Sequence, residues 1–249
     1  MRLKSALLFT SAILAFHANV AHANLIKNGG FESNVIDTSY RAEGAIIHNG
    51  GIRINDWVNS KNGTDSGGYD FLMKGSNAHE HGGAMRLHGY GENFFKSPSG
   101  GNFFASDPDY GPGTLKQYIN GLEVGTKYTL TFEYALAQQY WYEGANNNVW
   151  WEVGFGGVTQ NTTKLSIPER GFSGWKTAAM EFTATSTDDW LSFLSMRTSS
   201  GGPPFMLLDN VKLEAELKAE VPEPASSALM LAGLGMVGFL ARRRRNGKA

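Results

Sequence analysis

Alternating apolar and polar positions recur along the middle of this chain. The longest run covers residues 127–136, where every second residue is a large apolar one, as on a strand with one buried face. Similar runs occupy 115–119, 149–155, 178–184, 191–193 and 205–213, and turns rich in Gly, Asn and Asp separate them. Many short strands with no visible repeat period predict an all-β fold, a jelly-roll β-sandwich of two packed sheets.

The first 23 residues have a different pattern. Arg2 and Lys4 precede a short apolar run over 7–16, and Ala21-His22-Ala23 is an A-x-A cleavage site. We therefore predict a secretory signal peptide over 1–23 and a mature chain that begins at Asn24.

The last residues of the chain form three parts in a fixed order. A short motif, Val221-Pro222-Glu223-Pro224, ends a linker over 215–224. An uncharged apolar run follows over 225–241, and Arg242-Arg243-Arg244-Arg245 opens a basic tail over 242–249. About 17 apolar residues are at the short end of what crosses a bilayer, and a compact arginine group favours the cytoplasmic side. This pattern predicts a transmembrane helix with a cytoplasmic tail.

This order of segments resembles the PEP-CTERM sorting signal of Gram-negative bacteria. The resemblance implies an exosortase as partner, a precursor held in the inner membrane, and a processed product at the cell surface or in the extracellular matrix. The alternative is an ordinary tail anchor on a Pro-rich stalk. An ordinary anchor needs neither a Pro-Glu-Pro motif nor so compact an arginine stop.

Composition limits what the segment between the two terminal signals can bind and how it can be stabilised. The chain has 22 basic and 23 acidic residues; seven of the basic and one of the acidic residues lie in the two terminal signals, which leaves 15 against 22 and a net charge of −7. An acidic exported domain is a poor nucleic-acid binder. The chain has no cysteine, so a packed core or a bound metal must stabilise the domain without disulfides.

Three segments within residues 24–214 resemble the galactose-binding-like jelly roll of many carbohydrate-binding modules. They are Asn24 to Glu32 at the start, Gly171-Phe172-Ser173-Gly174-Trp175, and Leu207-Leu208-Asp209-Asn210-Val211 near the end. Residues 35–113 match little. The resemblance implies a structural Ca²⁺ held by Glu32 and Asp209 with backbone carbonyls, a donor set that suits this ion. Alternatively, Glu32 is a strand-edge charge and Asp209 caps a turn.

A sugar-binding face needs flat aromatic rings beside polar groups. Three consecutive aromatic residues lie in an Asn-rich connection, with Trp141 the strongest candidate, and further candidates occur on or beside predicted strands. The ligand-binding candidates are Trp57, Tyr140, Trp141, Tyr142, Trp150 and Glu152. Tryptophans are also common in sandwich cores, and we expect Trp151 and Trp175 to be core residues.

Catalytic motifs are absent from the sequence. His79, His81 and His88 have metal-binding side chains without the spacing of a zinc protease, and a surface loop explains them equally well. Asp107 and Asp109 lie in a Pro-Gly turn, where such carboxylates usually cap the turn. The sequence therefore predicts a non-enzymatic surface or matrix protein that binds extracellular polysaccharide. The alternatives are a purely structural or adhesive matrix protein and, less favoured, a glycan-active hydrolase.

Overall fold

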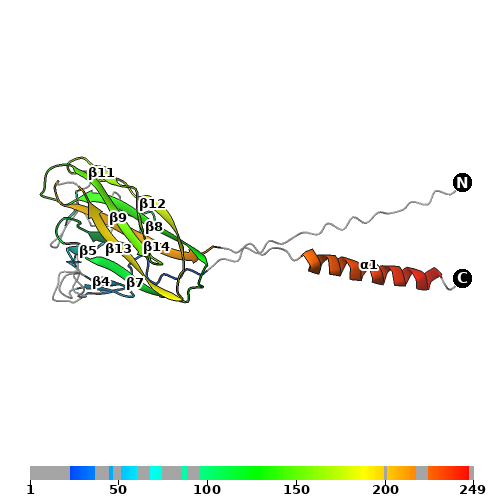
Figure 1. Cartoon of the computed structure of the whole chain (residues 1–249). Coiled ribbons are helices and arrows are strands. Elements are labelled where there is room, and N and C mark those ends of the chain that lie inside the picture. The colour runs from blue at the N-terminus through cyan, green and yellow to red at the C-terminus, as the bar shows by residue number, and fades with distance from the viewer. Residues whose placement is uncertain are drawn as a thin grey trace, which may run out of the picture. The chain divides into compact units, whose positions relative to one another are not determined.

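The computed structural model describes residues 23–36, 45–46, 52–60, 68–74, 86–88, 96–198, 201–216 and 224–246. The chain divides into two compact units, residues 1–216 and 217–249. The first unit contains all the described strands and the second contains one helix (Figure 1).

Two six-stranded sheets form the first unit. Sheet I has the order β10-β9-β13-β7-β4, and β11 also pairs with β9. Its described strands all pair antiparallel. Its strands are β4 (Val58–Ser60), β7 (Thr114–Asn120), β9 (Asn146–Phe155), β10 (Val158–Asn161), β11 (Leu165–Ile167) and β13 (Asp188–Arg197).

Sheet II lies against sheet I and has the order β12-β8-β14-β6-β5-β2. Its strands are β2 (Ala45–Ile46), β5 (Asp70–Lys74), β6 (Asn102–Ser106), β8 (Lys127–Gln138), β12 (Lys176–Thr183) and β14 (Pro204–Ala215). A small separate pair joins β1 (Asn34–Ile36) to β3 (Ile52–Ile54). The predicted all-β sandwich is confirmed. Strands β1 to β6 lie almost entirely within residues 35–113, the region with little resemblance to the galactose-binding-like jelly roll.

The main core fills the space between the sheets. Trp151 of β9 is fully buried, packs against Phe193 and Phe104, and donates its indole N–H to the carbonyl of Leu207 at 3.0 Å, so one side chain joins the two sheets. The prediction that Trp151 is a core residue is confirmed. Sheet II also carries a second buried apolar cluster, which includes Phe71, Phe103 and Phe205.

The first described residues dock along the last strand. Leu25 donates its backbone N–H to Leu213 at 2.9 Å, and Val211 donates to Gly29 at 3.0 Å. A Cβ at position 29 would lie 2.0 Å from the Val211 carbonyl oxygen, so only glycine fits. Beside this contact the pairing of β14 with β8 shifts register between Asp209 and Lys212. This bulge and the docked segment bring the first and last residues of the domain together.

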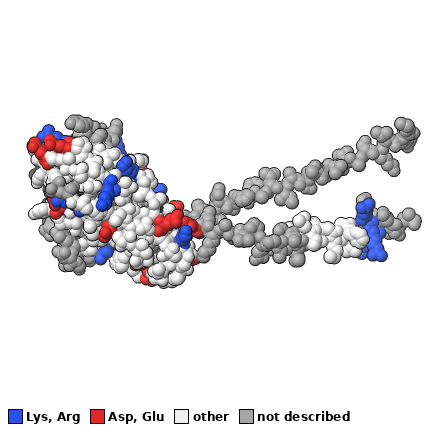
Figure 2. Space-filling view, turned by 45° about the horizontal axis from the view of Figure 1, so that its top comes forward, with Lys and Arg blue, Asp and Glu red and all other residues white. Residues whose placement is uncertain are grey.

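The second unit contains α1 (Pro224–Asn246). This helix includes the whole apolar run over 225–241 and continues through the arginines that follow it. Within the described ranges, no helix is both long enough and apolar enough to be assigned as a membrane span. The transmembrane helix over 225–241 stays a prediction. Figure 2 shows the arginines as a basic band on this helix.

Candidate functional site: an exposed aromatic loop and a carboxylate cluster

The connection between β8 and β9 presents aromatic side chains to solvent. Trp141 is 81% exposed and Tyr142 is 47% exposed. Tyr140 is half-buried, because its ring lies 4.6 Å from the His88 ring and the Arg86 guanidinium lies 3.9 Å from its centroid. Tyr140 in turn meets Trp141 edge-on at 4.6 Å. Tyr140 therefore supports the Trp141 ring from the protein side, and Trp141 is the outermost ring of the aromatic group predicted from the sequence.

The backbone of Trp141 lies in the left-handed region, with φ at 77°. For a bulky non-glycine residue this conformation is an outlier that persists only where the surroundings enforce it. The exposed Trp141 side chain buries little apolar area, so its packing offsets little of the cost of this backbone conformation. This combination points to an external contact.

Two other predicted ligand residues lie in buried positions. Trp57 is 7% exposed, packs against Phe31 at 5.5 Å and donates its indole N–H to the Asn28 carbonyl. Trp150 is also 7% exposed, since Lys164 lies over its ring and Asn161 accepts from its indole N–H. Both tryptophans were expected to be exposed, and both are buried for the same reason. Residues from other segments cover each indole ring, which the sequence around each tryptophan does not indicate.

The outer face of sheet I carries an aromatic pair that the sequence analysis did not single out. Tyr118 and Trp190 are register partners on β7 and β13, are 44% and 42% exposed, and have ring centroids 5.1 Å apart. Lys116 lies 4.8 Å over the Trp190 ring. Glu152, a predicted ligand residue, is half-buried on β9 of the same sheet. Strand alternation was the available signal, because the inward Ile119 and Leu191 place both aromatic residues outward.

Three carboxylates gather beside the β14 bulge. Asp209 and Glu133 are register partners on β14 and β8, and Asp209 is fully buried. The backbone N–H of Asn102 donates to Glu32 at 2.6 Å. A Cβ built at Gly30 would lie 3.7 Å from Asp209 Oδ1 and 4.0 Å from Glu32 Cγ, so these two acids flank the same glycine. Sequence reasoning predicted Glu32 and Asp209 but missed Glu133, which the strand pairing alone reveals.

Like charges directly opposite each other on paired strands are unfavourable unless something neutralises them. Burial raises the pKa of Asp209 to about 7, the hydrogen bonds from Ser97 and Asn210 lower it in part, and the nearby Glu133 and Glu32 raise it. In the described part of the chain, no three His, Cys, Asp or Glu side chains converge closely enough to form a metal centre on their own. The carboxylates, the Ser97 hydroxyl and the local carbonyls are nevertheless the oxygen donors that Ca²⁺ takes.

The candidate catalytic residues are the three histidines and the pair Asp107 and Asp109. His79 and His81 lie outside the described residues, and His88 packs on Tyr140. Asp107 Oδ1 accepts the backbone N–H of Asp109 at 2.7 Å, and Asp109 forms an ion pair with Arg197. This is the turn-capping arrangement expected for Asp107.

Two further buried carboxyls, Asp70 and Asp107, act in the same direction as Asp209 and make the stability of the domain depend on pH. Burial raises the pKa of Asp70 from 3.8 to about 6 and that of Asp107 from 3.8 to about 7, although hydrogen bonds lower both in part. The folded state then binds more protons than the unfolded state between about pH 4 and pH 7, so the free energy of unfolding should fall as pH rises through this window.

Chemical denaturation at pH 5 and pH 8 tests this pH dependence. Each pKa unit is worth about 1.4 kcal/mol, and the Asp70→Asn variant should show a shallower slope than the wild type. A stability that rises steadily from pH 5 to pH 8, or an Asp70→Asn slope equal to that of the wild type, would contradict this assignment.

Comparisons with known proteins agree with part of this description. Residues 220–245 match the PEP-CTERM protein-sorting motif, which marks the chain as an exported protein. Val221, Pro222 and Glu223 of this motif lie outside the described residues, and Pro224 begins α1. No curated protein matches the chain.

Several solved structures are similar to the β-sandwich. A cyclase from Fischerella sp. TAU, in complex with 4-(1H-indol-3-yl)butan-2-one, shares 21% identity over 78% of this chain and 98% of its own, with a TM-score of 0.45. The module TmCBM61, in complex with β-1,4-galactotriose, shares 15% identity over 78% and 99%, with a TM-score of 0.37. The CBM22-1 xylan-binding domain of Paenibacillus barcinonensis Xyn10C shares 10% over 80% and 97%, with a TM-score of 0.36. TM-scores below 0.5 assign neither a ligand nor a reaction to this chain.

Proposed function

We propose that this exported protein binds extracellular polysaccharide without catalysis, through the aromatic loop between β8 and β9. The observation that carries the proposal is Trp141, which is 81% exposed and has a φ of 77°. The apolar face of a sugar ring stacks on an indole, and neighbouring polar groups take its hydroxyls. Tyr142 and Glu143 follow Trp141 on the same loop and supply such groups.

A second candidate surface is the Tyr118–Trp190 pair, which is exposed on the opposite side of the β13–β7 pairing from the core residues Ile119 and Leu191. Matched alanine variants at Trp141 and Trp190 separate the two surfaces, because each removes one exposed indole. We expect the Trp141 variant to lose affinity and the Trp190 variant to keep it. The reverse result assigns binding to sheet I, and a wild type that binds no polysaccharide favours the purely structural matrix role.

We also propose that a Ca²⁺ ion bound by Glu32 and Asp209 fastens the start of the mature chain to β14. The support is the docking of the first residues on β14 and the mutually repelling carboxylates beside it, of which Asp209 is fully buried. Glu133 would add negative charge to the same site, and backbone carbonyls would complete the oxygen shell. The ion would supply charge neutralisation and a crosslink in a domain without disulfides.

The sorting motif suggests an exosortase as processing partner, with cleavage near Pro222-Glu223-Pro224 and release to the cell surface or matrix of a Gram-negative host. An inner-membrane stage in that processing stays a prediction. Intact-mass analysis of the protein from its host should give a product that begins at Asn24 and lacks Arg242 to Arg245. Replacing Pro222 and Glu223 by alanine should leave the arginine tail attached. Full-length protein that retains both Met1 and the tail in the wild type would refute this route.

A further inference from the structure

The Trp141 loop is held by a second strained segment. Arg170, after β11, also has a left-handed backbone, with φ at 57°. Two non-glycine residues in this conformation, in two segments joined by hydrogen bonds, point to a locally enforced geometry. We propose that Arg170 is a positioning residue, which together with Gln138 holds Trp141 in its outward conformation ready for a sugar ring. This inference rests on the proposed function of the loop.

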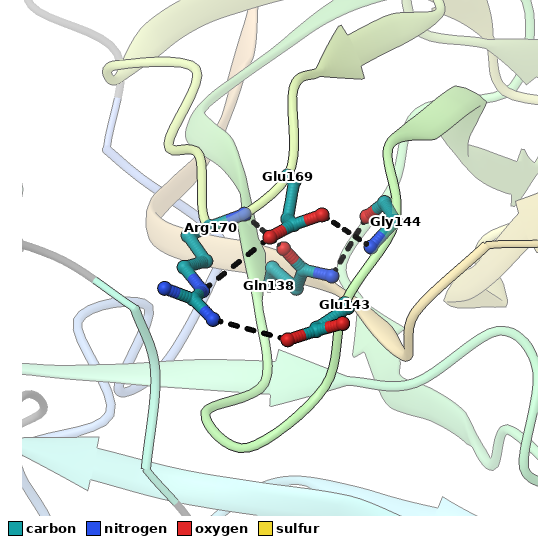
Figure 3. Close-up of polar contacts among 5 residues, drawn as sticks. All are labelled: Gln138, Glu143, Gly144, Glu169 and Arg170. Atoms are coloured by element: carbon teal, nitrogen blue, oxygen red, sulfur yellow. Dashed lines mark hydrogen bonds and ion pairs between the residues drawn. The ribbon is translucent and has the colours of Figure 1, made fainter.

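The guanidinium of Arg170 lies between two carboxylates (Figure 3). Its Nη2 is 3.2 Å from Glu143 Oε1, and its Nε is 3.5 Å from Glu169 Oε1. The other oxygen of Glu169 accepts the backbone N–H of Gly144 at 3.2 Å. Because Glu143 and Gly144 directly follow Trp141 and Tyr142, these contacts fix the outgoing side of the loop.

Gln138 fixes the incoming side of the loop from within the protein. Its side chain is fully buried, its amide N–H donates to the Gly144 carbonyl at 2.8 Å, and its amide oxygen accepts the backbone N–H of Arg170. A Cβ at Gly202 would lie 2.2 Å from Gln138 Nε2 and 2.8 Å from the Glu143 carbonyl oxygen, so the backbone packs closely here. One amide therefore ties both ends of the loop to the Arg170 segment, as Figure 3 shows.

The exposure of the ion pairs argues for a local role. The side chains of Arg170, Glu143 and Glu169 are 54%, 74% and 47% exposed, and exposed ion pairs contribute little to global stability. Their geometric effect is larger, because a loop fixed before binding does not have to be ordered when the ligand arrives. Arg170 should therefore affect Trp141 and glycan affinity while leaving the melting temperature nearly unchanged.

The test uses the full-length protein labelled with 5-fluorotryptophan, with the Trp141 signal assigned from a Trp141→Phe variant. We expect one sharp ¹⁹F resonance for Trp141 in the wild type, and a broadened or split one in Arg170→Gln. Arg170→Lys, which keeps the charge but not the two-sided fork, should be intermediate. Lys127→Gln is the matched control, since it removes another exposed ion pair, with Glu181 at 3.5 Å, and should leave the resonance unchanged.

Polysaccharide affinity gives the second readout. Arg170→Gln should weaken binding five- to tenfold in the wild type and have no further effect in the Trp141→Ala background. An unchanged ¹⁹F resonance, a large fall in melting temperature, or an equal affinity loss in both backgrounds would overturn the positioning role. If the wild type binds no polysaccharide, the proposed function fails, while the ¹⁹F comparison still decides the role of Arg170.

Discussion

Replacing Trp141 by alanine should weaken binding to the host's extracellular polysaccharide about 30-fold. Truncation of an aromatic anchor at the centre of a binding surface typically costs at least about 2 kcal/mol, which corresponds to that factor. The side chain is 81% exposed, so the free energy of unfolding should change by less than about 0.5 kcal/mol. Affinity electrophoresis or calorimetric titration against the purified polysaccharide measures the first quantity, and urea denaturation measures the second.

The control for this prediction is the Trp190→Ala variant, whose indole is 42% exposed on sheet I. Its affinity should stay within about twofold of the wild type, since a contact outside the binding surface contributes little. A loss confined to Trp190→Ala would move the glycan surface to sheet I. Equal affinities for the wild type and both variants would remove the aromatic residues from the mechanism.

Adding calcium should produce the largest change in stability. Extracellular calcium modules bind with dissociation constants of about 10⁻⁴–10⁻³ M. For a constant near 10⁻⁴ M, about 10 mM Ca²⁺ would stabilise the folded state by about 2.7 kcal/mol. For a domain of this size that raises the melting temperature by about 5–10 °C relative to a sample in EDTA. Differential scanning calorimetry measures the shift.

The variants Asp209→Asn and Glu32→Gln should abolish most of the calcium-dependent shift, because each removes a proposed ligand. Glu181→Gln, which changes an exposed carboxylate on the edge strand β12, should keep it. A melting temperature that is the same in Ca²⁺ and in EDTA would contradict the calcium site. A shift of equal size in Asp209→Asn would place the ion elsewhere.

Strand alternation predicted much of sheets I and II. The run over 127–136 became β8, and the runs over 115–119 and 149–155 lie within β7 and β9. These segments have one buried face, so their own side-chain period defines them. Strands β1 to β6 escaped prediction, since they are short, lie in Gly- and Asn-rich sequence, and depend on pairing with distant partners such as β7 and β14.

The candidate site was only partly readable from sequence for a similar reason. Trp141 was predicted from the polarity of its loop, and that property is local. The burial of Trp57 and Trp150, by contrast, is imposed by Phe31 and Lys164 from remote segments. Glu133 became visible only when the pairing of β14 with β8 placed it opposite Asp209. The role proposed for Arg170 likewise rests on a contact with Glu143, 27 positions earlier in the chain.

Hydroxyl-radical footprinting of the tryptophans, with and without purified host polysaccharide, tests the binding surface most directly. It reports on each indole in the unmodified protein by mass spectrometry. Glycan binding through the aromatic loop predicts strong, saturable protection of Trp141 from oxidation, with Trp190 unchanged. Protection of Trp190 alone, or the same oxidation of Trp141 at every polysaccharide concentration, would contradict it.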